Sequence, residues 1–250
     1  MKKTLMTASL LSLLVCTASA SGLNLGWSDC PTGAGYKLDN NFACNTNTGA
    51  ANILVGSYFP PAGLTAVNSN EAVVDVQTDQ SALSPWWTMG STGCVGRTGT
   101  PTGNFDFTGG PSSCTDYWAG NASGGASYYP AWSSDPPHTG GPANRARIIL
   151  VCAISEGLAG ALDPGTEYYS FKCTISNART VGTPSCAGCT DLACLVMNSI
   201  KIIQNPGLGD VYVEDVAQAR HVTWRGGLSP DCQATPAKQS TWGSVKALYR

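Results

Sequence analysis

The class of fold is clearest in TEYYSFKCTI, residues 166–175, where bulky and polar side chains alternate. One face of this extended segment carries Tyr169, Phe171, Cys173 and Ile175, and the other carries Tyr168, Ser170, Lys172 and Thr174. A period of two, with aromatic residues on the apolar face, predicts a half-buried antiparallel strand.

Apolar segments elsewhere in the chain predict further strands at residues 53–59, 72–76, 148–154 and 195–203. The segment 148–154 is almost continuously apolar, which is typical of a central strand. Residues 211–216 and 220–225 alternate in the same way and predict a hairpin. Many short strands without helices between them predict an all-β antiparallel sandwich, of jelly-roll type, with long Gly/Ser/Thr-rich loops.

Residues 90–142 differ from the rest of the chain, because they are dense in Gly, Ser, Thr and Pro and contain few aliphatic residues. We expect one long loop region here, and long loops within a compact domain are often functional. Helical periodicity is weak except near the end, where a short helix would align Trp242, Val245, Leu248 and Tyr249.

The first twenty residues have the three parts of a secretory signal. They carry a basic start at Lys2 and Lys3, an apolar run over 10–15, and small residues at 18–20. We therefore expect cleavage after Ala20, a secreted or periplasmic protein, one domain over 21–232 and a tail over 233–250. Val15 before Cys16 disfavours a lipoprotein signal, and the apolar run is shorter than the roughly 20 residues that span a bilayer.

Charge argues against a nucleic-acid partner. Residues 1–20 contain two of the 14 basic residues and none of the 16 acidic ones, so the rest of the chain carries 12 against 16, a net charge of −4. The local basic pair, Arg145 and Arg147, directly precedes the apolar segment 148–151 and is expected to flank a strand rather than contact phosphates.

Ten cysteines remain after the expected cleavage, and an even number in an exported chain favours disulfides. Sequence proximity suggests Cys30 with Cys44, Cys94 with Cys114, and Cys152 with Cys173. The other four, Cys186, Cys189, Cys194 and Cys232, are expected to form two more disulfides. A structural zinc site on these four thiolates is the alternative, and a redox role for Cys186 and Cys189 is disfavoured because a strand-like segment follows.

Catalytic groups are scarce. The two histidines, His138 and His221, lie 83 positions apart, with neither a Gly-x-Ser-x-Gly elbow nor a His-Glu-x-x-His motif. The oxygen-rich segment 39–47 does not fit an EF-hand calcium loop and is expected to form turns. We therefore expect a non-catalytic protein without a cofactor, and the alternative is a hydrolase that uses paired carboxylates such as Asp116, Glu156 and Glu167.

Aromatic residues in or beside the long loops favour a binding function, since exposed rings offer large, rigid contact area. The candidate ligand-binding residues are Trp86, Trp87, Trp118, Tyr128, Tyr129 and Trp132. We expect a glycan, another surface polymer or a surface protein as the partner. The alternatives are that these rings cover the core, or that the protein is a structural component of the cell envelope.

Several stretches resemble a group of uncharacterised exported bacterial proteins. They are the segment from Leu23-Asn24-Leu25 to Cys30, PGTEYYSF at 164–171, the cysteine cluster at 186–194, and the end of the chain from Thr241-Trp242-Gly243 to Arg250. The resemblance implies export, a β-rich domain and a cysteine framework, and it implies no particular activity.

Overall fold

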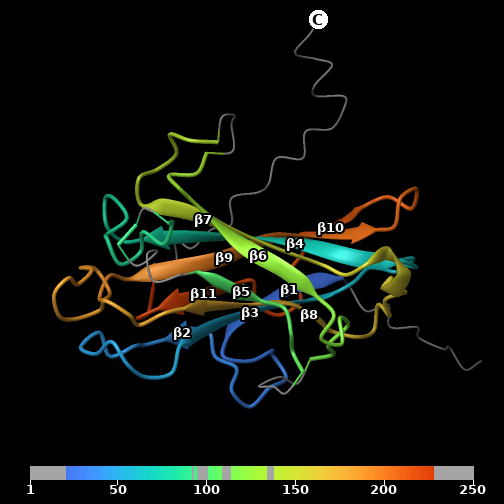
Figure 1. Ribbon diagram of the computed structural model, residues 1–250, viewed down its shortest axis with the longest axis horizontal. Coiled ribbons are helices and arrows are strands. Elements are labelled where there is room, and N and C mark those ends of the chain that lie inside the picture. Colours follow the sequence, from blue (N-terminus) through green and yellow to red (C-terminus); the bar gives the residue numbers. More distant parts are fainter. Residues whose placement is uncertain (1–20, 92, 95–100, 109–113, 134–137, 228–250) are drawn as a thin grey trace, which may run out of the picture.

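A computed structural model describes residues 21–91, 93–94, 101–108, 114–133 and 138–227, which form two stacked β-sheets (Figure 1). Sheet A has the order β1 (Gly22–Trp27), β3 (Asn52–Phe59), β8 (Tyr168–Ile175) and β5 (Thr102–Asn104). Sheet B has the order β2 (Asp39–Asn40), β11 (His221–Trp224), β9 (Ala193–Gln204), β4 (Val67–Thr78), β7 (Arg145–Ala153) and β6 (Ser123–Pro130). The strand β10 (Val211–Val213) also pairs with β9, and a 3-10 turn, η2, covers Glu156–Leu158.

The predicted all-β sandwich is confirmed. Every strand pair is antiparallel except β2 with β11, and the described residues contain no α-helix. The strands predicted at 53–59, 72–76, 148–154 and 195–203 correspond to β3, β4, β7 and β9. The segment 148–154 lies in a central strand as expected, since β7 pairs with both β4 and β6.

Strand β8 shows one departure from simple alternation. Its pairing with β3 shifts register between Gly56 and Ser57, so that Gly56 lies opposite Phe171 and Ser57 opposite Tyr169. Such a bulge reverses the side-chain direction. Phe171 therefore points into the main core, whereas Tyr169, which was predicted to share its face, packs on the outside of sheet A.

The predicted hairpin over 211–225 is wrong. Strands β10 and β11 both pair with β9, at different places along it, with Val211 opposite Ile202 and His221 opposite Val196. The chain between them crosses to sheet A, where Leu25 donates its N–H to the Ala219 carbonyl at 2.7 Å. This crossing covers the outer edge of β1, which explains why all six residues of that strand are buried.

The long loop expected at 90–142 is also wrong in part, because it contains β5 and β6. Strand β6 pairs with β7 over its full length, from Ser123 opposite Ala153 to Pro130 opposite Ala146. Its sequence is unusual for a strand because two glycines follow Ser123. The close packing of β6 on β7 requires a glycine at position 124, since a Cβ there would collide with the Val151 carbonyl oxygen.

Tryptophans form the centre of the core. Trp27, Trp86, Trp87 and Trp224 are all 0% exposed, and neighbouring ring centroids lie 5.0 to 6.1 Å apart. Three of the four indoles donate a hydrogen bond, to the Thr223 carbonyl, the Thr180 hydroxyl and the Cys189 carbonyl. Burial of such rings together with their polar atoms supplies much of the apolar stabilisation of the sandwich.

Disulfides join loops that are distant in the sequence, and the predicted neighbour pairings are wrong. The bonded pairs are Cys30 with Cys114, Cys44 with Cys189 and Cys94 with Cys186. Cys194 is also disulfide-bonded, and its partner lies outside the described residues. Because Cys186 and Cys189 bond to Cys94 and Cys44, the expectation of two disulfides within the group Cys186, Cys189, Cys194 and Cys232 is wrong. The alternative zinc site on these four residues is wrong as well, since the first three are oxidised.

The last predicted pair, Cys152 and Cys173, is not bonded. Both cysteines are free thiols buried in the main core, one on β7 of sheet B and the other on β8 of sheet A. Burial raises the pKa of each thiol to about 12, so both remain protonated and unreactive in the folded protein near neutral pH.

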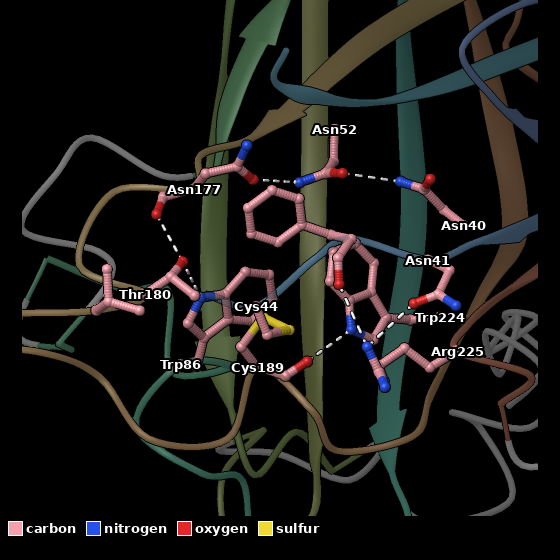
Figure 2. Close-up of a disulfide and its surroundings, with 12 residues drawn as sticks. Asn40, Asn41, Cys44, Asn52, Trp86, Asn177, Thr180, Cys189, Trp224 and Arg225 are labelled. Atoms are coloured by element: carbon pink, nitrogen blue, oxygen red, sulfur yellow. Dashed lines mark hydrogen bonds between the residues drawn. A yellow bond between two sulfur atoms is a disulfide. The ribbon is translucent and has the colours of Figure 1, made fainter. Parts of the chain in front are cut away.

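Figure 2 shows how the Cys44–Cys189 disulfide is embedded. A chain of buried amides runs beside it, in which Asn40 donates to Asn52 at 2.8 Å and Asn52 donates to Asn177 at 2.7 Å. The carbonyl of Asn177 accepts a bond from the hydroxyl of Thr180. The segment 39–47 begins with strand β2 and continues as bends, so the expectation that all of it forms turns is wrong.

The outer faces of the two sheets differ. Loops cover part of sheet A, where Phe107 stacks on Tyr169 at 4.4 Å beside the Cys30–Cys114 disulfide. Sheet B exposes large side chains on its outer face, including Tyr129 on β6 and Val151 on β7. Within the described residues no helix is long and apolar enough to cross a membrane. The expected signal at 1–20, and the terminal helix and tail, lie outside these residues.

Candidate functional site

The candidate ligand-binding residues occupy very different environments. Trp86 and Trp87 are 0% exposed and Trp118 is 1% exposed, so the exposure expected of these three is wrong. Tyr128 is largely buried, its hydroxyl donates to the Trp87 carbonyl at 2.8 Å, and burial raises the pKa of its phenol. Tyr129 is 42% exposed and Trp132, like Tyr128, is partly buried, so among the six candidates Tyr129 is the most open to solvent.

These two aromatic residues meet at the end of β6. The Trp132 ring lies 5.6 Å from that of Tyr129 in an edge contact, and it stacks on the His138 ring at 4.7 Å with an angle of 3°. The turn is held by backbone bonds from Ala131 to the Arg145 carbonyl and from Gly141 to the Ala131 carbonyl. Gly141 is required there, because a Cβ would collide with the Trp132 carbonyl oxygen.

A buried ion pair supports the aromatic residues. The Arg147 guanidinium binds both oxygens of Asp75, with Nε to Oδ1 at 2.6 Å and Nη2 to Oδ2 at 2.8 Å. The side chains are only 7% and 12% exposed, respectively. The Arg147 Cζ also lies 4.6 Å from the centre of the Trp132 ring. A planar guanidinium suits this combination, since it pairs bidentately with a carboxylate and stacks on an aromatic ring.

Register places these groups in one row across sheet B. Tyr129 on β6 and Asp75 on β4 both lie opposite Arg147 on β7, on either side of it. Side chains that are directly opposite on neighbouring strands share a face. Trp132 then follows β6 by two residues and lies against the arginine in this row.

A small pocket of about 150 Å³ opens beside this row. Its lining residues are Asp75, Trp132, Ser133, Gly141, Pro142, Arg145 and Ala146. The Nε of Arg145 and the Nε1 of Trp132 are buried, and neither has an acceptor among the described residues. We call the group formed by Asp75, Tyr129, Trp132, His138, Arg145 and Arg147 the Trp132 site.

The carboxylates considered for catalysis have structural roles or lie in the open. Glu167 accepts bonds from Asn24 and Ser57 at 2.6 and 2.7 Å. Asp116 accepts the backbone N–H groups of residues 118 and 119, and Glu156 is exposed in η2. Glu167 also approaches the sulfurs of Cys30 and Cys114, but these two sulfurs are bonded to each other and are not thiolate ligands.

The histidines are not close partners in any catalytic arrangement among the described residues. His138 lies in the Trp132 site, where its Nδ1 is 3.2 Å from the Ser133 carbonyl. His221 is exposed on β11, opposite Val196. The stacking of His138 on Trp132 was not predicted from the sequence.

Three charged residues of the site were missed as functional candidates. Arg145 and Arg147 were interpreted only as flanking a strand, and Asp75 was not singled out. The sequence does contain a signal, because Asp75 lies between two valines and the two arginines share one face of β7. Charges placed at alternate positions of apolar strands indicate a polar group on the outer face.

Comparison with known proteins gives little. No family model matches the chain and no curated protein matches it. Among solved structures, the chain is similar to a "Cohesin module from Clostridium perfringens ATCC13124 family 33 glycoside hydrolase", with 9% identity over 82% of this chain and 97% of that chain. The TM-score is 0.36, which is too low to support an argument about this protein.

Proposed function

We propose that this protein is an exported, non-catalytic binding protein that engages a protein partner through the Trp132 site. The observation that carries the proposal is the Trp132 ring on the outer face of sheet B, which contacts Tyr129 and Arg147 and lines a small pocket together with Arg145. Tyrosine, tryptophan and arginine are the residues most enriched at the energetic centres of protein interfaces.

The scaffold supports this proposal because an ion pair and ring contacts hold Arg147 and Trp132 in place. The bidentate Asp75–Arg147 pair fixes the arginine, and the arginine in turn packs on Trp132. A preorganised surface loses little conformational entropy when a partner binds. Export is supported by the signal-like residues 1–20, by the disulfides, which persist in oxidising compartments, and by the resemblance to exported bacterial proteins.

A photo-crosslinking experiment tests the proposal. A benzoylphenylalanine introduced at position 129 is exposed to envelope and medium fractions of the producing cells, and position 212 serves as the matched control. The two tyrosines are 42% and 46% exposed, but Tyr212 lies on β10 and outside the site. We expect a discrete adduct with another protein from position 129 only, and competition by the unmodified protein.

The partner found in this way allows a quantitative test. Tyr129→Ala is expected to weaken binding about tenfold or more, as interface tyrosines commonly do, while Tyr212→Ala leaves it unchanged. Equal adducts from both positions, or no adduct from position 129, contradict the proposal. An adduct of the protein with itself supports instead a structural component that assembles in the envelope.

A further inference from the structure

The pocket of the Trp132 site has unused hydrogen-bonding capacity. Arg145 and Trp132 both line it, and each contributes a buried N–H that has no acceptor among the described residues. A buried donor without an acceptor is unfavourable, so such donors normally find a partner. Two of them at one surface pocket indicate a place for an external acceptor.

Charge indicates what kind of acceptor fits. Asp75 lines the pocket, but both of its oxygens are bound to Arg147, which compensates its charge. Among the described residues the ion pairs are Arg147–Asp75 and Lys201–Asp210. No acidic side chain of this part of the chain therefore pairs with Arg145. Counted over the described residues, the site therefore has an excess charge of +1, in a chain with a net charge of −2.

We propose that the pocket receives the carboxylate of an aspartate or glutamate side chain of the partner protein. This inference deepens the proposed function and rests on it. A carboxylate has two oxygens, so it can accept bonds from both the Arg145 guanidinium and the Trp132 indole. Its negative charge also compensates the excess positive charge.

Size and ring packing favour a side chain over a sugar ring. Pockets for whole small molecules usually measure about 300 to 1,000 Å³, and this one measures about 150 Å³. A sugar ring would stack on an aromatic face, but His138 and Arg147 already pack against the Trp132 ring. The pocket is thus small enough to suit a single carboxylate, and it presents the donors of Arg145 and Trp132 that are unpaired among the described residues.

The binding of isolated carboxylates tests the proposal directly. The ¹⁵N-labelled, disulfide-bonded full chain is titrated with the α-amides of N-acetyl-aspartate and N-acetyl-glutamate, and with N-acetyl-asparagine amide as the uncharged control. NMR then follows the Trp132 Nε1–H signal, assigned by its loss in Trp132→Phe, and the Arg145 Nε–H signal. We expect saturable shifts of both signals with the acidic amides, with dissociation constants on the order of 1 mM, and none with the asparagine amide.

Variants separate the pocket from general charge. Arg145→Gln is expected to fold normally, because the native side chain has no partner among the described residues, and to weaken aspartate amide binding at least tenfold. Arg220→Gln is the matched control, since this half-buried arginine donates to the Glu214 carbonyl and does not line the pocket. It should leave the shifts unchanged.

Each outcome has a defined meaning. Equal shifts with the asparagine amide, shifts that persist in Arg145→Gln, or no saturable shift overturn the carboxylate pocket. Stronger shifts with D-glucuronate than with either amino-acid amide overturn the protein source in favour of an acidic glycan. If the acidic amides do not bind but crosslinking from position 129 succeeds, only the carboxylate pocket is contradicted. If crosslinking from position 129 gives no adduct, the proposed function itself is contradicted.

Discussion

Replacing Asp75 by asparagine should leave the Arg147 guanidinium buried without a charged partner. Arg147 is 7% exposed and both of its bonds to Asp75 are short, at 2.6 and 2.8 Å. Removing one partner of a buried pair typically costs about 3 to 5 kcal/mol. Because an asparagine oxygen can still accept one bond, we expect a loss of about 3 kcal/mol.

Urea unfolding with the disulfides intact measures this loss without screening the charges. With a slope of about 2 kcal/mol/M, the midpoint should fall by about 1.5 M. Arg147→Met and the double variant Asp75→Asn/Arg147→Met complete a double-mutant cycle. The double variant should be less destabilised than the sum of the single variants by about 2 kcal/mol. If Asp75→Asn lowers the free energy of unfolding by less than about 1 kcal/mol, or if the effects of the two single variants simply add, the buried pair is not strongly coupled.

Two further predictions concern the core. Burial raises the pKa of Cys152 and Cys173 to about 12, from an unperturbed value of 9.0. Both thiols therefore lose their protons at a lower pH in the unfolded chain than in the folded protein. The free energy of unfolding should then fall as the pH rises from about 9 to about 12. Between pH 8 and pH 10, the free energy of urea unfolding should fall more for the native protein than for Cys152→Ala/Cys173→Ala. Alkylation without reductant should label both thiols only in denaturant. Trp118→Ala should lower the free energy of unfolding by about 3 to 5 kcal/mol, since this ring is 1% exposed. A loss below about 1 kcal/mol would contradict the burial of Trp118.

Local periodicity was sufficient to predict the main strands and insufficient to predict their details. The apolar residues of β3, β4, β7 and β9 contact the core through a pattern visible within a few neighbouring positions. The bulge in β8 is different, because it depends on the partner strand, where Gly56 admits the Phe171 ring. Strand β6 was missed for a related reason, since glycine has low strand propensity and the close approach that requires Gly124 is made by β7.

Disulfide pairing and the predicted hairpin failed because both depend on topology. Proximity in the sequence favours closure of short loops in the unfolded chain, but the Cys44–Cys189 bond joins residues 145 positions apart. The loops that carry these cysteines are brought together by the order of the strands. In the same way, β10 and β11 are neighbours in the sequence, yet each finds a different part of the long strand β9.

The aromatic candidates show that composition alone does not distinguish an exposed ring from a buried one. Trp86 follows Pro85 in a loop-like segment, but its indole donates to Thr180 and its ring packs on Trp224. A loop tryptophan with a hydrogen-bond partner inside the protein is stable when buried. Tyr128 and Tyr129 are adjacent and therefore point to opposite faces of β6, which places one in the core and the other at the surface.

The Trp132 site depends on strand register, and this dependence separates its residues by role. Asp75 and Arg147 are 72 positions apart and meet only if β4 and β7 pair as observed. A slip of one residue would turn the arginine toward the apolar core, so the ion pair helps to specify the register. Arg145 lies on the same face of β7 without a partner among the described residues, so we expect it to contribute less to stability than Arg147. Variants at Asp75 should therefore affect folding first, whereas variants at Arg145 should affect binding alone, and a reversal of these two effects would contradict the assignment of the site.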